Sequence, residues 1–420
     1  MQRWRVSVFS IYRLAFVILS VPLFYRIKLI PLIGSWDLNL GYLMIIAMTL
    51  LLGVKKVDTQ AILLLLWWMA LWVGGIYGVF VFGPQVIKPN VKLNLIFLGF
   101  ILTYIAGTRV LRNERNVKRL LVFLSDFSLL LSISVLLEFS ILLIWGIPAV
   151  ERLYTFLGYN AGNLSLTKTL QYYRAGGFLG TPENTGFALG ILVGGQYFLY
   201  RYILPKARGK WLKIAIGITA LVLTQSRGGV LALIIIVAFI RILNSKNLFR
   251  QLSGAVSLSV FTGGILWLSL RYIPHFSLER FMWGIKWHSA TVYSGFQAAL
   301  ASPVVGWGWA PLRIVVSQIR TDNYLGFYYL VLKEKPIQAG VVEVFARSGM
   351  VGLILFTLIV WRALQKSWRA SLPYRGWLFG TLMAILSITG IAGPFLYNVR
   401  TFGFPLWFFF TMLAVAQYTS

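Results

Sequence analysis

Apolar runs alternate with short polar segments along almost the whole chain. Many of these runs approach the length of about 20 residues that a helix needs to cross a bilayer. Backbone groups inside a bilayer must be paired within the chain, so runs of this kind form helices. The pattern predicts about twelve spans, at 6–24, 38–54, 61–82, 93–107, 120–147, 185–204, 211–225, 229–243, 253–273, 341–361, 376–393 and 402–418. We therefore expect an all-α polytopic membrane protein, with residues 1–420 as one transmembrane domain.

Two connections are much longer than the others, at 148–184 and 274–340. Of the 39 basic residues, 21 lie on the opposite side, in the N-terminal segment, the short connections and the span ends beside them. This excess of Lys and Arg marks the cytoplasmic side. Both termini are then cytoplasmic, and the two long connections lie on the outer face. Long ordered loops are usually functional, so we look for chemistry there.

The composition agrees with a membrane protein, and the charge indicates which partners to expect. The chain is 58% hydrophobic and 12% charged, with a mean hydropathy of +0.77 and no cysteine. A net charge of +28 would suggest nucleic acid in a soluble protein. Here the basic residues are spread between spans, so we expect membrane lipids and a phosphate-bearing substrate as partners, and no nucleic acid. Tryptophan and tyrosine in 274–340 fit either an interfacial belt or sugar stacking.

The first candidate site is Ser226-Arg227-Gly228-Gly229, where two apolar runs meet. An arginine at membrane depth is costly and is a functional hypothesis by default. The alternative is a helix hairpin whose Arg227 extends to a lipid phosphate. On the outer face this segment would open a helix N-terminus, which offers free N–H groups and a partial positive charge to an anion.

The segment from Arg174 to Asn184 forms a second candidate site before the sixth span. Thr181 and Pro182 look like an N-cap followed by proline at the first helical position. Glu183 then lies in the first turn, where it is either a general base or a carboxylate that complements the helix dipole.

Other polar residues within the apolar runs have more ordinary interpretations. Glu343 and Arg347 are four apart on one predicted helix and should pair with each other. Arg13 needs an acidic partner, for which Asp126 is the candidate. His275 and His288 have no neighbours at metal-ligand spacing, so we expect no metal. No Asp-x-Asp pair and no GxxxxGK[ST] loop occurs, so we expect no cofactor or nucleotide.

Four segments in order, RAGGFLGTPENTGFALG, LTQSRGGVLAL, ALASPVVGWGWAPL and PIQAGVVEVFARSGMVGLILF, resemble the bacterial O-antigen ligase and O-antigen polymerase superfamily. The resemblance covers about residues 170–360. It implies a helical glycosyltransferase of the GT-C type in the bacterial inner membrane, acting at the periplasmic face. Its donor would be a glycan on undecaprenyl diphosphate and its acceptor a second glycan, with a chain-length regulator protein as a further partner.

The resemblance also implies roles for particular residues. Arg227 with Ser226 would hold the diphosphate, and Arg174 and Arg280 would be further basic contacts. The family's histidine falls at Gln338, which can hydrogen-bond a sugar or phosphate but cannot act as a base. This departure favours the polymerase branch over a ligase. It leaves Glu183, and after it His288, as candidates for the base that assists the acceptor hydroxyl.

Three other functions fit the same pattern. A ligase would move the glycan to lipid A core or to protein. A transferase using a lipid-monophosphate sugar would depend on an acid in the first outer loop, where Asp37 is suitably placed. A flippase or exporter of anionic lipid-linked glycans would also need a basic cavity, but one that opens to the cytoplasm.

Overall fold

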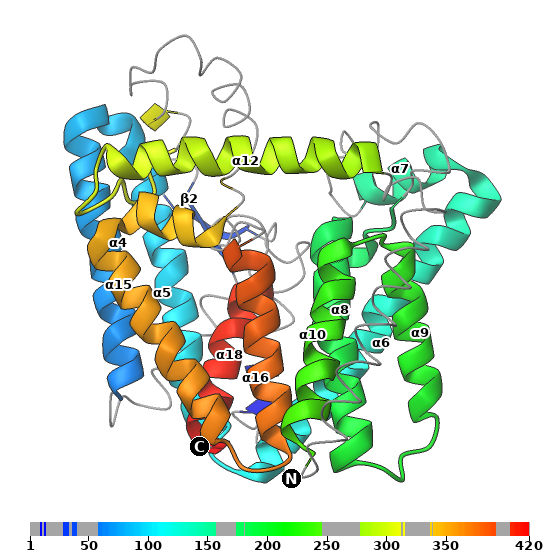
Figure 1. Cartoon of the computed structure of the whole chain (residues 1–420). Helices are drawn as coiled ribbons and strands as arrows, with labels where there is room; N and C mark the ends of the chain where they lie inside the picture. The colour runs from blue at the N-terminus through cyan, green and yellow to red at the C-terminus, as the bar shows by residue number, and fades with distance from the viewer. Residues whose placement is uncertain are drawn as a thin grey trace, which may run out of the picture.

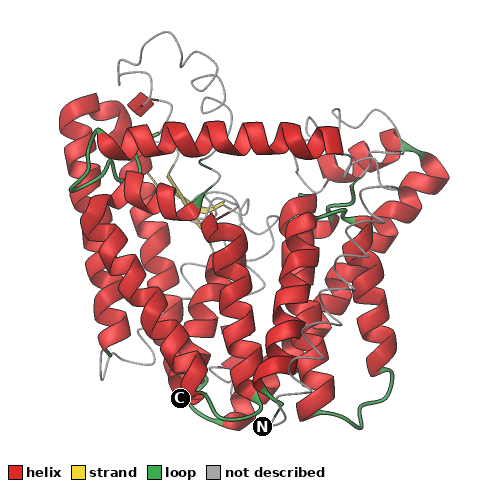
Figure 2. Cartoon of the chain, in the orientation of Figure 1, coloured by secondary structure: helices red, strands yellow, loops and turns green. Residues whose placement is uncertain are grey.

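The computed structural model describes residues 9–10, 12–13, 28–32, 36–39, 58–156, 174–179, 181–245, 278–311, 314–315, 337, 339–391 and 404–419. Helices dominate this part of the chain (Figure 2). The principal helices are α4 (Thr59–Phe82), α5 (Ile87–Val110), α6 (Glu114–Trp145), α7 (Ile147–Phe156), α8 (Pro182–Phe198), α9 (Lys210–Leu223), α10 (Arg227–Leu243), α12 (Leu278–Leu300), α15 (Gly340–Arg369), α16 (Tyr374–Ile385) and α18 (Phe404–Thr419). Short 3-10 turns lie at Pro84–Val86 and Gly177–Leu179, and π-helical turns follow α8 at Leu199–Ile203 and α16 at Leu386–Ile391.

Most helices run roughly side by side, while α12 lies transversely across one end of them (Figure 1). In the view of Figure 1, α4, α5, α15, α16 and α18 form one group, and α6, α8, α9 and α10 form the other. The contact of α10 with α16 joins the two groups, and α10 also packs against α8. The C-terminal helix α18 ends at the side of the bundle opposite α12.

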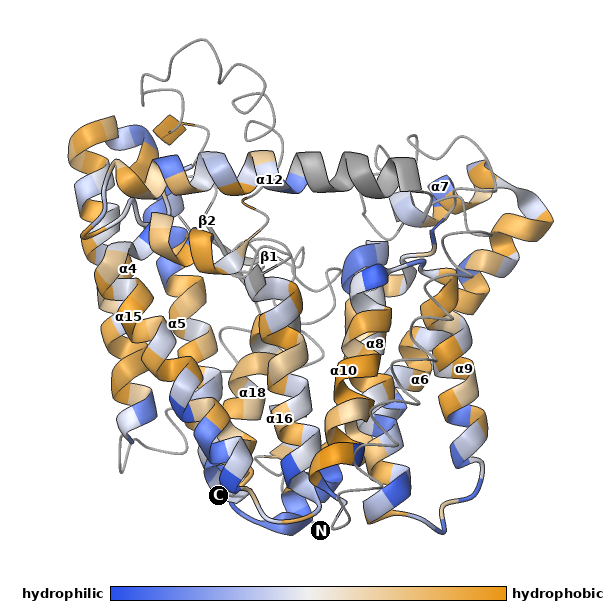
Figure 3. Cartoon of the chain, in the orientation of Figure 1, coloured by the Kyte–Doolittle hydropathy of each residue, from blue (hydrophilic) through white to orange (hydrophobic). Residues whose placement is uncertain are grey.

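Four helical segments are long and apolar enough to cross a membrane, at Thr59–Phe82, Pro84–Val110, Glu114–Trp145 and Gly340–Arg369. Apolar residues cover the middle of the helices, and hydrophilic residues gather at their ends (Figure 3). Many large apolar side chains on α4 and α6 face outward, as lipid-facing side chains do. These features define the chain as a helical membrane protein.

The apolar runs of the sequence correspond well to the helices that the structure describes. Nine of the twelve predicted spans match described helices, with α5, α6 and α15 longer than predicted. The spans expected at 6–24, 38–54 and 253–273 lie wholly or mostly outside the described residues. The fold departs from a purely helical one in a short antiparallel hairpin, β1 (Lys28–Leu32) with β2 (Trp36–Asn39).

Glycines bring α8 and α10 into backbone contact. A Cβ atom on Gly229 would collide with the carbonyl oxygen of Gly186, and one on Gly190 would collide with the carbonyl oxygen of Gly229. Small residues allow this close approach between membrane helices, where packing rather than water exclusion drives association. The contact lies one turn from Arg227 and Glu183, so it sets the distance between the first turns of α8 and α10.

Substituting Gly229 by valine should force α8 and α10 apart. The obstacle is a backbone carbonyl that cannot rotate away, so we expect a loss of about 3 kcal/mol or more in stability. Gly195→Ala on α8 is the matched control, because a Cβ atom there meets only Trp377 Nε1 at 3.6 Å. Thermal unfolding of the detergent-solubilised protein measures both. An unchanged melting temperature for Gly229→Val would contradict the close packing.

The turn that follows α12 hydrogen-bonds to the backbone of α15 where that helix is broken. Gly349 has φ of +62°, which interrupts the helix. The N–H groups of Trp307 and Gly308 donate to the carbonyl oxygens of Ala346 and Arg347, at 3.0 and 2.7 Å. The N–H of Met350 donates to Pro303 O at 2.8 Å. Backbone groups released by the break therefore have partners, as buried groups require.

Candidate functional site

The chain between 174 and 179 is anchored by a buried carboxylate of α6. Glu138 is 2% exposed. It accepts from Gly176 N–H with both oxygens (3.1 Å each), and from Gly177 N–H at 2.5 Å. Tyr154 of α7 donates its hydroxyl to the same carboxylate at 3.0 Å. Gly177 has a φ of +54°, and glycine adopts such a conformation most readily. The carboxylate thus folds this segment over α6.

Replacing Glu138 by glutamine should loosen this segment. The amide NH₂ group cannot accept a hydrogen bond, so at least one backbone N–H would lose a charged acceptor. Bonds to charged groups contribute about 1.5–3 kcal/mol each. We expect a loss of that size in the free energy of unfolding, seen as a lower melting temperature. Faster hydrogen exchange at Gly176 and Gly177 would locate the effect. A variant with wild-type exchange there would remove Glu138 from this role.

Arg174 joins the end of one helix to the start of another. Its Nε donates to Thr224 O at 3.1 Å, and its Nη1 pairs with the Glu183 carboxylate. Thr224 caps the C-terminus of α9, and Glu183 lies in the first turn of α8. The Arg174 side chain is 14% exposed and that of Glu183 is 66% exposed. A guanidinium has five N–H groups, so Arg174 has donors beyond these two bonds.

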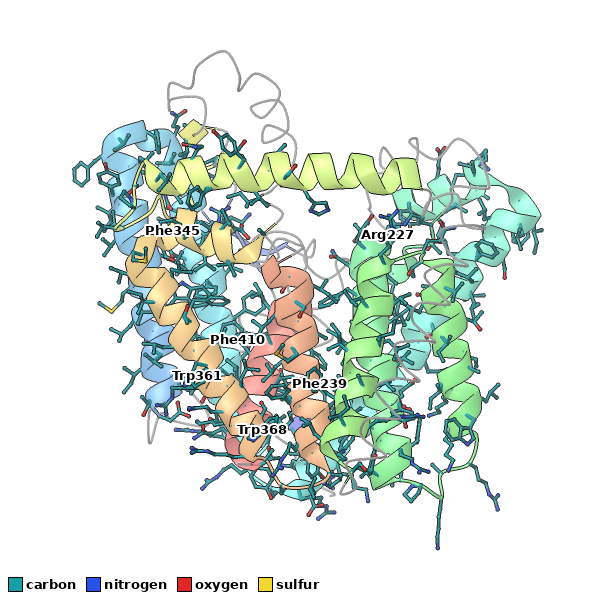
Figure 4. The ribbon with its side chains drawn as sticks, viewed as in Figure 1. Arg227, Phe239, Phe345, Trp361, Trp368 and Phe410 are labelled. Atoms are coloured by element: carbon teal, nitrogen blue, oxygen red, sulfur yellow. The ribbon has the colours of Figure 1, made fainter. Side chains whose placement is uncertain are left out.

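Arg227 is the first residue of α10, next to this ion pair. Figure 4 shows it at the end of α10 that lies nearest α12. Its guanidinium is partly exposed and lies within electrostatic reach of Arg174. Two cations and the N-terminal end of α10 therefore concentrate positive charge in one place, which suits an anion.

Ser226 is the N-cap residue of α10, so the predicted helix start at this segment is confirmed. Its hydroxyl oxygen accepts from Gly229 N–H at 3.2 Å, and the residue is 3% exposed. This bond fixes the helix start that carries Arg227. The direct contact to the diphosphate that the resemblance implies for Ser226 stays a prediction. Gln225 before it has a φ of +48°, a conformation that is uncommon for residues other than glycine. This tight turn joins α9 to α10. It follows directly after Thr224, whose carbonyl oxygen accepts from Arg174.

Thr181 is confirmed as the N-cap residue of α8, with Pro182 at the first helical position. Its side chain, however, makes no capping bond, and its Oγ1 has no hydrogen-bond partner among the described residues. Thr185, one turn later, instead donates its hydroxyl to Gly176 O. The start of α8 is therefore tied to the 174–179 segment.

The second polar cluster lies on α15, close to its break. Glu343 and Arg347 form the expected pair, with Nε and Oε1 separated by 3.1 Å and side chains 0% and 4% exposed. Arg347 Nη1 donates to Gly308 O at 3.2 Å, and the guanidinium lies 5.0 Å from the centroid of the Trp309 ring. Trp309 N–H donates to Asn90 Oδ1 at 2.5 Å. This cluster fastens the turn after α12 to α4, α5 and α15.

The remaining predicted residues are placed less completely. His288 lies on α12 with an exposed side chain, and its carbonyl oxygen accepts from the Thr291 hydroxyl at 2.9 Å. Arg280 lies in the first turn of α12, but its side chain is not described. Gln338 lies outside the described residues, and Asp37 lies on β2 without a described side chain. The structure brings together Arg174, Glu183, Ser226 and Arg227.

Sequence reasoning missed the roles of Glu138, Thr224 and Asn90. A carboxylate in an apolar run marked Glu138 as unusual, but nothing in its spacing pointed to glycines that follow so much later in the chain. Among the described residues, no group of three His, Asp or Glu side chains is placed to hold a metal ion.

No protein-family model matches this chain, and no curated protein matches it significantly.

Proposed function

We propose that the protein is a periplasmic-face glycosyltransferase that polymerises undecaprenyl-diphosphate-linked repeat units into a surface polysaccharide. The observation that supports this most directly is the grouping of Arg174 and Arg227 at the start of α10, beside the carboxylate of Glu183. Diphosphate carries several negative charges and needs cations that hold it as it leaves. The resemblance of the four sequence segments points to the same substrate.

In this proposal the acceptor hydroxyl attacks the anomeric carbon of the donor sugar, and the bond from that carbon to the diphosphate oxygen breaks. The electron pair goes to the diphosphate, whose developing charge Arg227 and Arg174 stabilise. The hydroxyl proton goes to a base. The proposal needs no metal, because the two arginines supply the positive charge that the departing diphosphate requires. It needs no nucleotide, because the donor sugar is carried on the lipid diphosphate.

The Arg174–Glu183 pair gives this reaction a simple order of events. The Glu183 carboxylate is held by Arg174 before substrate arrives. A diphosphate that binds Arg174 competes for the same guanidinium and weakens its hold on the carboxylate. Glu183 is then an exposed carboxylate next to the bound donor, which is where a general base is needed.

The test is an assay with purified full-length protein and a lipid-diphosphate-linked repeat unit, without metal or nucleotide. Polymerisation should give a ladder of products on a gel and release lipid diphosphate. Release only when lipid A core or a protein acceptor is added would replace the polymerase by a ligase. Transport of the lipid across vesicles, without transfer, would replace the enzyme by a flippase.

A further inference from the structure

A second, separate concentration of positive charge lies at the opposite end of the bundle from Arg227. It surrounds a cavity of about 650 Å³ between the N-terminal segment and the first turns of α6. Four cationic side chains line it, from Arg13, Arg115, Lys118 and Arg119. The charge distribution predicts that this end faces the cytoplasm.

The cations come from two separate elements and converge on one space. Arg115, Lys118 and Arg119 are three and four residues apart on α6, so they share one face of that helix. Arg13 approaches from the N-terminal segment, with its guanidinium carbon 5.2 Å from the Phe9 ring centroid and 5.7 Å from that of Phe123. These two rings hold the Arg13 charge at the cavity.

The cluster is electrostatically unfavourable as it stands. Cations in the first turns of a helix oppose its dipole, and like charges four residues apart repel. The carboxylate that lines the cavity, Asp126, pairs with Lys213 of α9 at 3.0 Å, so it does not offset the four cations. An insertion signal needs basic residues near the span end. It does not need Arg13 to converge with them around a cavity.

The lining also changes character along α6. Arg115, Lys118 and Arg119 lie near the helix start, and Val122 and Phe123 follow on the same face. The lining continues to Asp126, so it extends over about three turns of the helix. Basic side chains in the first turns, followed by Val122 and Phe123, match a phosphate headgroup with the upper part of its acyl chains. Asp126 lies beyond these apolar residues, paired with Lys213.

We propose that this cavity is a binding site for an anionic phospholipid of the inner leaflet, whose phosphate contacts Arg13 and the three basic residues of α6. Basic pockets between membrane helices on the cytoplasmic side commonly hold such headgroups. The volume lies within the usual range of ligand sites, about 300–1,000 Å³. This site is independent of the glycosyltransferase proposal.

The test compares binding of phosphatidylglycerol and phosphatidylcholine to the purified full-length protein by native mass spectrometry. The variant is Arg115→Gln/Lys118→Gln/Arg119→Gln. Each basic residue near an anionic lipid surface contributes enough for about a fivefold change in affinity. We therefore expect a loss of about tenfold or more in phosphatidylglycerol affinity, with phosphatidylcholine unchanged.

The matched control is Lys206→Gln/Arg208→Gln/Arg369→Gln, which removes three exposed basic residues at the same end of the bundle. It should keep phosphatidylglycerol binding. The charge-preserving variant Arg115→Lys/Arg119→Lys should also keep it, and guards against a folding defect as the cause. Equal losses in the control and the cavity variant would overturn the site. Inorganic diphosphate that binds as tightly as the lipid would make it a soluble-anion site.

Discussion

Arg227→Ala should reduce polymer formation by about a hundredfold or more, while the protein remains folded. Removing one group that stabilises developing charge typically costs a factor of about 10²–10³ in rate. Arg227 is partly exposed at the start of α10, so its loss leaves no cavity in the core. The measurement is the rate of lipid-diphosphate release and the length of the product ladder.

Two comparisons decide whether the effect is specific. Arg241→Ala removes an exposed arginine from the last turn of the same helix and should leave activity near the wild-type level. Arg227→Lys should recover part of the activity, because it keeps the charge but loses the planar pair of donors. Wild-type activity in Arg227→Ala would show that Arg227 does not hold the diphosphate, although the protein would still be a polymerase.

The second large effect is expected at Arg347. Replacing Arg347 by leucine removes the guanidinium that pairs with the buried Glu343 carboxylate, and breaking a buried pair from one side costs about 3–5 kcal/mol. The turn after α12 also loses the contact to Gly308 O and the cation over Trp309. Thermal unfolding in detergent should show a large loss of stability.

Removing both charges should be milder than removing one. In Glu343→Gln/Arg347→Leu neither buried charge of the pair remains, so part of the lost stability should return. Arg369→Leu near the end of the same helix is the control, since that side chain is exposed. If Arg347→Leu and Arg369→Leu unfolded at the same temperature, the buried pair would have no role in stability.

Local signals in the sequence predicted local structure well. The length of the apolar runs predicted the helices. Local sequence signals predicted the Thr181 cap, the helix start at Ser226–Gly229 and the Glu343–Arg347 pair. The ends of α5, α6 and α15 were missed, because these helices continue beyond their apolar runs into polar turns.

Contacts between distant segments were harder to predict. Asp126, the expected partner of Arg13, is paired with Lys213 instead, and Arg13 lies against aromatic rings. Spacing along the chain carries no information on which helix faces which, so this choice depends on the packing of α9 against α6. The hydrogen bonds of Gly176 and Gly177 to Glu138 are likewise contacts between segments far apart in the chain, which local spacing does not predict.

The break in α15 makes one backbone amide a reporter in hydrogen–deuterium exchange. The N–H of Met350 does not depend on its own helix for protection, since it donates to Pro303 O. Its exchange with solvent therefore reports on the docking of the turn after α12, while the amides further along α15 report on the helix. Undocking of that turn would label Met350 first and leave the rest of α15 protected.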